Sequence, residues 1–258
     1  MGTIIDYPWL VFALSFLVLW LSAWLGASFL RKRVKLRDDM RDDLSLVLAA
    51  TLTLLGLIIG FSFSMATSRY DQRKNYEEAE ANAIGTEYVR ADLLPAADAA
   101  KVRSLLRSYL DQRVLFYTTR DEREVPEIDA RTARLQAELW SAVVGPAAAR
   151  PTPPIALAVS GMNDVLNSQG YTQAAWWNRI PHAAWILMTA IAVCCNVLVG
   201  YRAQDVRAEA LLPVLPLVVA ISFLLIADID SPRGGLIRVS PQNLTSLAGS
   251  LRAPDGKP

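Results

Sequence analysis

The sequence predicts an all-α polytopic membrane protein, with four transmembrane helices in two hairpins and a helical soluble domain between spans two and three. Hydrophobic residues make up 53% of the 258 residues, yet charged residues still make up 20%, so the apolar residues must be concentrated in blocks. Four runs contain no Asp, Glu, Lys or Arg: 7–30, 44–68, 180–201 and 210–227. Each approaches the roughly 20 residues that cross a bilayer as a helix, the conformation that satisfies its own backbone polar groups there.

These runs predict the domain organisation. The predicted parts are a first transmembrane hairpin at 1–68 with spans at about 8–30 and 44–68, a soluble domain at 69–179, a second hairpin at 180–230 with spans at about 182–201 and 210–227, and a C-terminal tail at 231–258. Both termini are expected on one side of the membrane. The two short linkers carry eight Lys and Arg residues, against two on the opposite side, or six when the basic residues at the roots of the soluble domain are added. This count favours a cytoplasmic first linker.

The soluble segment has the apolar periodicity of amphipathic helices. The first helix is predicted from Val102, Leu105, Leu106, Tyr109 and Leu110. The second is expected over about 127–144, with Ile128, Leu135, Leu139 and Val143 facing inward, and ends at a Pro-rich linker. A third is expected over about 154–168, stopping at Gly170.

The second span is expected to continue beyond the membrane as one long helix. Residues 44–94 contain no proline, and a helix of these 51 residues would be roughly 75 Å long. Charged residues at helical spacing pair Arg73 with Glu77, Lys74 with Glu78, and Glu87 with Arg90. We interpret these as exposed pairs, each stabilising the helix by a few tenths of a kcal/mol.

The membrane half of this helix has a small-residue stripe formed by Thr53, Gly56, Gly60 and Ser64. One interpretation is a helix-packing face, because a GxxxG pair lets helices approach closely. The other is a pore lining, in which Thr53, Leu57 and Phe61 form stacked rings in an oligomer. A scaffold requires the stripe to be buried against another span of the same chain, whereas a channel requires one face of 53–64 to be turned toward a symmetry axis.

Two blocks carry a family resemblance. The block "LGLIIGFSFSMATSRYDQRKNYEEAEANAIGTEYVRADLLP" and the later "IADIDSPRGGLIRVSPQNLTSL" resemble bacterial membrane proteins described as bestrophin-like and, more distantly, the bestrophin chloride channels. The matching motif residues are Arg69, Tyr70, Asn82, Gly85, Arg90, Asp228, Asp230, Pro232 and Arg233. The resemblance implies a pentameric channel for small anions in the bacterial cytoplasmic membrane, with Thr53, Leu57 and Phe61 forming the neck. The chain differs from bestrophins at Tyr70 and Asp71, where they have a double Trp, and at Thr53, where they have a large apolar residue.

Other chemistry is not indicated. No phosphate loop, nucleophile elbow or metal-ligand spacing occurs, so we expect no enzyme and no cofactor, and the net charge of +1 does not favour nucleic acid. Asp228 and Asp230 either cap the fourth span, pairing with Arg233, or begin a cation site. Two functions therefore remain: a homo-oligomeric ion channel, and a non-conducting membrane scaffold or sensor that relays signals through the long second helix.

Overall fold

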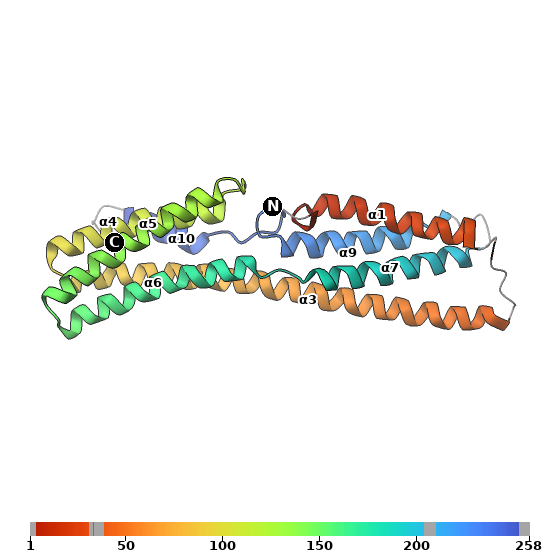
Figure 1. The fold of residues 1–258 in the computed structure, drawn as a ribbon, viewed down its shortest axis with the longest axis horizontal. Coiled ribbons are helices and arrows are strands. Elements are labelled where there is room, and N and C mark those ends of the chain that lie inside the picture. The colour runs from red at the N-terminus through yellow and green to blue at the C-terminus, as the bar shows by residue number, and fades with distance from the viewer. Residues whose placement is uncertain (1–3, 31–32, 34–38, 204–209, 253–258) are drawn as a thin grey trace. The chain divides into compact units, whose positions relative to one another are not determined.

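The computed structural model describes residues 4–30, 33, 39–203 and 210–252, and all regular structure in these ranges is helical (Figure 1). The all-α prediction is thereby confirmed. The elements are η1 (Ile4–Asp6), α1 (Pro8–Leu25), η2 (Gly26–Leu30), α3 (Asp39–Arg90), η3 (Ala91–Leu93), α4 (Ala96–Thr118), α5 (Val125–Ala149), α6 (Pro153–Trp177), α7 (His182–Arg202), α9 (Val214–Asp230) and α10 (Gln242–Arg252).

Three helical stretches of the described chain are long and apolar enough to cross a membrane. They are Pro8–Leu30, Asp43–Leu93 and Pro153–Arg202. The fourth expected span coincides with α9, which has 17 residues because the chain turns over 211–213 and becomes helical only from Val214. The four-span topology therefore stays a prediction.

Prolines mark where most of the helices begin. A proline lacks the N–H that a first helical turn leaves unpaired, and its ring presets the helical φ. Proline lies in the first turn of α1, α5 and α6, and at the N-cap of α4, α7 and α9. The starts of these helices thus follow directly from local sequence chemistry.

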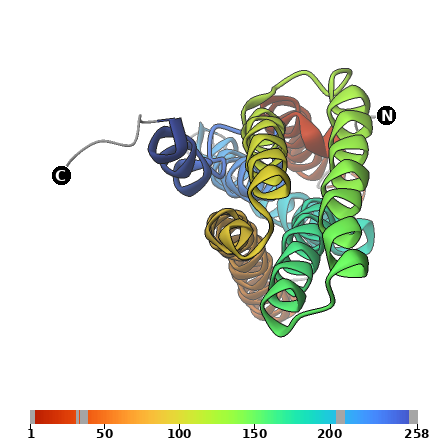
Figure 2. The same cartoon turned by 90° about the vertical axis from the view of Figure 1, so that its left-hand side faces the viewer.

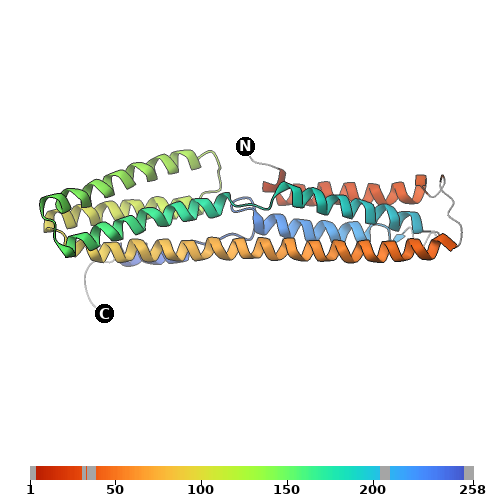
Figure 3. The ribbon, with the colours of Figure 1, turned by 60° about the horizontal axis from the view of Figure 1, so that its bottom comes forward.

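The chain divides into two compact units. Unit 1 consists of residues 1–70 and 179–238, and unit 2 of residues 71–178 and 239–258. Helix α3 contributes its first part to unit 1 and its last part to unit 2, and Figure 3 shows it running without a break. The expected long second helix is therefore present, at 52 residues.

In unit 1, α1 packs against α7 and α9. Two glycines allow the backbones of this bundle to approach closely: a Cβ on Gly200 would meet the carbonyl oxygen of Ala23, and one on Gly26 would meet that of Val197. The inner face of α3 supplies Leu55 and Ala66 to the same core.

In unit 2, α4, α5 and α6 pack in sequence order, and α10 lies beside α4 (Figure 2). Most of the predicted apolar faces are confirmed, with Val102, Leu106 and Tyr109 of α4 and Leu139 and Val143 of α5 all buried, whereas Leu105 and Leu135 are only half-buried. Their burial against neighbouring helices gives this charged segment its core.

Two predicted helix ends are too early. Helix α5 continues through Pro146 to Ala149, because the proline falls in the last turns and its ring is buried. Helix α6 continues through Gly170 to Trp177. A helical glycine costs only about 1 kcal/mol, which the burial of Thr172 and Trp176 offsets.

The interpretation of the charged pairs on α3 as exposed pairs is wrong for three of their six members. Arg73 is 2% exposed, Glu77 is 1% exposed and Glu87 is fully buried. The i,i+4 spacing also places side chains on a face that other helices cover: α10 donates to Glu77, and α6 packs over Glu87 at Gly161.

Helix α10 falls within the predicted C-terminal tail, and the sequence analysis did not anticipate it. Its buried residues are Leu244 and Ala248. The N–H of Leu244 donates to Oε1 of Glu77 at 2.9 Å, and Nδ2 of Asn243 donates to Oε2 of Glu77 at 2.7 Å. A buried carboxylate of α3 thus satisfies the N-terminus of α10, where the helix dipole favours negative charge.

Candidate pore-lining face and its supporting contacts

The candidate neck residues lie on a face of α3 that no other described part of unit 1 covers. Leu57 is 53% exposed and Phe61 is 62% exposed, and Thr53 is exposed as well. The Thr53 hydroxyl donates to the carbonyl of Ala49 at 2.9 Å, so its polar group is satisfied inside the helix. On the opposite side of α3, Leu55 is only 2% exposed. The structure therefore leaves two large apolar side chains, one turn apart, free for another partner.

The small-residue stripe is equally open. A Cβ added to Gly56 or to Gly60 would meet no other atom within 4 Å, and Ser64 is exposed. The glycine pair that a membrane helix uses for close approach is therefore not used between the described spans of this chain. The condition that we set for the scaffold, burial of the stripe within the chain, is not met among the described residues.

The exposed positions continue along α3 beyond the apolar part. Among them, eight recur at alternating intervals of four and three residues, at Leu57, Phe61, Ser64, Ser68, Asp71, Asn75, Glu78 and Asn82. This spacing places the eight side chains along one face of the helix, the geometry by which a helix faces a partner that lies beside it. We call these eight residues the α3 seam. It changes from apolar to polar at Ser64, as expected for a helix that passes from lipid into water.

The turn after α9 holds the two carboxylates for which two roles remained open. Asp228 accepts the N–H groups of Leu236 and Ile237 at 2.7 and 2.8 Å. Asp230 is buried, and its Oδ2 accepts hydrogen bonds from the backbone N–H of Ile180 and from Nε of Arg179, both at 3.2 Å. These donors are those of a structural cap rather than of an open cation site.

Arginines connect this turn to other parts of unit 1. Nη1 of Arg69 lies 3.9 Å from Asp230, and Nη1 of Arg179 lies 2.7 Å from Asp6. Arg69 and Asp230 belong to the two family blocks, so the structure brings those blocks together. Asp6 and Arg179 are additional members that sequence reasoning missed. Only their positions beside the ends of predicted spans could have indicated them.

In unit 2, the motif residues Asn82 and Gly85 line a groove between α3 and α10 of about 490 Å³. A Cβ on Gly85 would lie 3.3 Å from Leu247, so the missing side chain lets α10 approach α3. The third motif residue, Arg90, places Nη1 3.9 Å from Oδ2 of Asp164 on α6. These motif residues therefore hold helices together.

A buried charged cluster joins α3, α4 and α6. Nε of Arg113 donates to Oε1 of Glu80, and neither side chain is exposed. Oε2 of Glu80 also accepts the hydroxyl of Thr172 at 3.2 Å and that of Tyr117 at 3.5 Å. Burial, and then the charge of Glu80, raise the pKa of Tyr117, so its phenol stays protonated. Sequence reasoning missed this cluster because its members are far apart in the chain.

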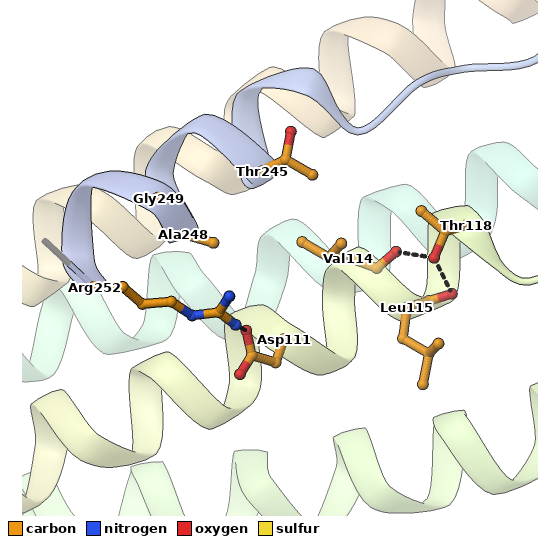
Figure 4. Close-up of a pocket in the computed structure, with 8 residues that line it drawn as sticks. All are labelled: Asp111, Val114, Leu115, Thr118, Thr245, Ala248, Gly249 and Arg252. Atoms are coloured by element: carbon orange, nitrogen blue, oxygen red, sulfur yellow. Dashed lines mark hydrogen bonds and ion pairs between the residues drawn. The ribbon is translucent and has the colours of Figure 1, made fainter.

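A second groove, of about 390 Å³, runs between α4 and α10 (Figure 4). Val114 and Leu115 of α4 form its apolar side, and Arg252 reaches from α10 to Asp111 of α4 at one end. No group of three or more His, Cys, Asp or Glu side chains that could hold a metal ion occurs among the residues with described positions.

A family profile described as the bestrophin-like domain matches residues 12–244. The chain belongs to the bestrophin-like family. Its fold is similar to that of a bacterial bestrophin homologue from Klebsiella pneumoniae, with a TM-score of 0.61 at 17% identity over 93% of this chain and 94% of the other. A variant of that homologue gives a TM-score of 0.64 at 16% identity, over 96% and 98% of the two chains. At this identity the likeness concerns the fold. No curated protein matches the chain.

For a bestrophin-like protein, the described geometry adds one distinction. The residues that match the family motif contact other parts of their own unit, through Arg69, Gly85, Arg90, Asp228 and Asp230. The candidate neck residues instead remain exposed within the described chain. The family blocks therefore combine residues that build the fold with a face left open.

Proposed function

We propose that this protein is a homo-oligomeric ion channel of the bacterial cytoplasmic membrane, with a neck lined by α3. In this proposal, the two hairpins at 1–68 and 180–230 provide four spans, the segment at 69–179 forms a helical soluble domain, and the first linker is cytoplasmic. Thr53, Leu57 and Phe61 form successive rings around the symmetry axis. The family resemblance supports a pentamer and small anions as the permeant species.

The observation that carries the proposal is the open face of α3 over residues 53–64. Leu57 and Phe61 are more than half exposed, and a Cβ added to either neighbouring glycine would meet no side chain or other helix of the described chain within 4 Å. Lipid alone could cover the apolar residues. Contact with lipid would not explain the glycine pair, or an exposed seam that continues into the polar half of α3. Packing against other copies of α3 accounts for both.

Apolar rings provide a physical mechanism for gating. A narrow apolar constriction excludes ions because it cannot hold the water that hydrates them, and widening it restores wetting. Thr53 would add a small polar ring, but its hydroxyl is already bonded to the Ala49 carbonyl. The barrier is therefore assigned to Leu57 and Phe61.

The test is ion flux through liposomes that contain the purified protein. We expect Leu57→Ala and Phe61→Ala to raise the flux several-fold, because shrinking a ring eases wetting. Phe63→Ala is the matched control, since Phe63 is 44% exposed but lies outside the α3 seam. Chloride and sodium are measured separately to identify the permeant ion. Folded wild-type and Phe61→Ala proteins that both leave liposomes tight to chloride and to sodium would refute the channel and favour the scaffold.

A further inference from the structure

Glu87, near the end of α3, is a buried acid that has no hydrogen bond. The residue is fully buried, and neither of its carboxyl oxygens has a hydrogen-bond partner among the described residues. Burying an ionised carboxylate without hydrogen-bond donors costs much more free energy than burying the neutral, protonated acid. Burial raises the pKa of Glu87 to about 8, with the Arg90 charge opposing this rise and the Asp164 charge adding to it.

The space for this carboxyl group is made by a glycine of α6. A Cβ on Gly161 would meet both Oε2 of Glu87 and the Nη1 end of Arg90. The acid and the guanidinium therefore lie together in the gap left by one missing side chain. Nη1 of Arg90 also lies 3.9 Å from Oδ2 of Asp164, whose side chain is 63% exposed.

Two other charged groups near this end of α3, Arg103 and Asp92, are already paired with each other. Arg103 of α4 bonds to Asp92 of η3 and donates to the carbonyl of Tyr88, while its guanidinium lies 5.3 Å from the Tyr88 ring. On the α10 side, the residue facing α3 at Gly85 is the apolar Leu247. Arg90 and Asp164 are thus the two charges that act on Glu87.

We propose that Glu87 is a proton-binding site, and that loss of its proton draws Arg90 away from Asp164. With the proton bound, Glu87 is neutral and Arg90 remains paired with Asp164. When the proton leaves to solvent, the buried carboxylate becomes the stronger partner for the same guanidinium. Asp164, being exposed, is then solvated by water. The contact between α3 and α6 thus has two charge arrangements, with Arg90 paired to Asp164 when Glu87 is protonated and to Glu87 when it is ionised, and pH selects between them.

The direction of the pH dependence follows from linkage. A glutamate in the unfolded chain ionises near its model value of 4.5, whereas the buried one keeps its proton to about 8. Between these values the folded state binds one more proton, so this residue makes the protein less stable as pH rises. The effect is complete above about pH 8, where both states are ionised. This goes beyond the proposed channel and does not depend on conduction.

The test uses the full-length protein in detergent and two measurements. Infrared difference spectra should show a protonated carboxyl band at pH 7 that disappears near pH 8 and is absent from Glu87→Gln. The melting temperature of the wild type should fall relative to Glu87→Gln between about pH 5 and 8, and the difference should then stay constant. Glu78→Gln, at an exposed position of the same helix, is the control and should behave as the wild type.

Two further variants keep the proposal testable if Glu87→Gln does not fold. Asp164→Asn should lower the pH at which the band disappears, because it removes a charge that favours the protonated acid. Arg90→Gln should raise that pH, because it removes the counter-charge of the ionised acid. A band that titrates below pH 6, or that neither variant moves, would overturn the proposal.

Discussion

Replacing Arg113 by methionine should destabilise unit 2 more than any exposed substitution on the same helix. Arg113 supplies the only charge that the described structure places directly on Glu80, and its guanidinium also lies 4.5 Å from the centre of the Phe116 ring. Methionine has a similar shape but no donors. Glu80 would keep only the hydroxyls of Thr172 and Tyr117.

The expected loss is large because both charges are fully buried. Removing one partner of a buried ion pair typically costs about 3 to 5 kcal/mol, since it leaves an uncompensated charge. For a chain of this size, each kcal/mol lowers the melting temperature by about 2 to 4 °C, so a fall of about 6 to 20 °C is expected. The double variant Glu80→Met with Arg113→Met should recover most of this loss, because it removes both charges.

The assay is thermal unfolding of the purified protein in detergent, followed by circular dichroism. Arg107→Met, on the exposed side of α4, is the control and should change stability by less than about 0.5 kcal/mol. An Arg113→Met protein that melts within about 2 °C of the wild type would refute the reasoning, because Glu80 would then not depend on its partner.

Two further predictions concern glycines with opposite surroundings. Gly60→Leu should reduce the oligomer mass measured by light scattering while leaving the helical content unchanged, because the described chain has no atom within 4 Å of the added Cβ; an unchanged oligomer would mean that the stripe is no interface. Gly200→Val should lower the free energy of unfolding by about 1 to 3 kcal/mol or more, seen as a lower melting temperature and a lower yield of folded protein, because its side chain meets the carbonyl of Ala23. Gly145→Ala in α5, where the Cβ has open space, should instead be neutral or stabilising by up to about 1 kcal/mol, and equal losses for the two would contradict this argument.

The helices were predictable because their signals are local. Uncharged runs, apolar periodicity at Leu106 and Leu139, and the absence of proline from α3 each depend on neighbouring residues. The ends of α5 and α6 were not predictable from the same signals, since Pro146 and Gly170 are tolerated only because tertiary contacts bury the residues around them.

The supporting contacts of the candidate site were less predictable. The family blocks identified Arg69 and Asp230. The ion pairs of Arg179 with Asp230 and with Asp6 could not be predicted, because they depend on how the bundle folds. Three glutamates of α3 lie at helical spacing, yet their surroundings differ. Glu77 caps α10, Glu80 pairs with Arg113, and Glu87 has no hydrogen bond among the described residues. Sequence spacing places all three on a helix, whereas the surrounding helices determine what each does.

The link between Glu77 and Leu244 has a consequence for biosynthesis. The two residues are 167 positions apart, and α7 and α9 are encoded between them. At about 5 to 20 residues per second, a ribosome needs roughly 8 to 33 s to make that interval. Glu77 is therefore synthesised long before the helix that it caps, and during this time its carboxylate must stay hydrated or be shielded by another protein. Unit 2 can complete its core only after α7 and α9 have been synthesised, so the last step of its folding follows the synthesis of these two apolar helices.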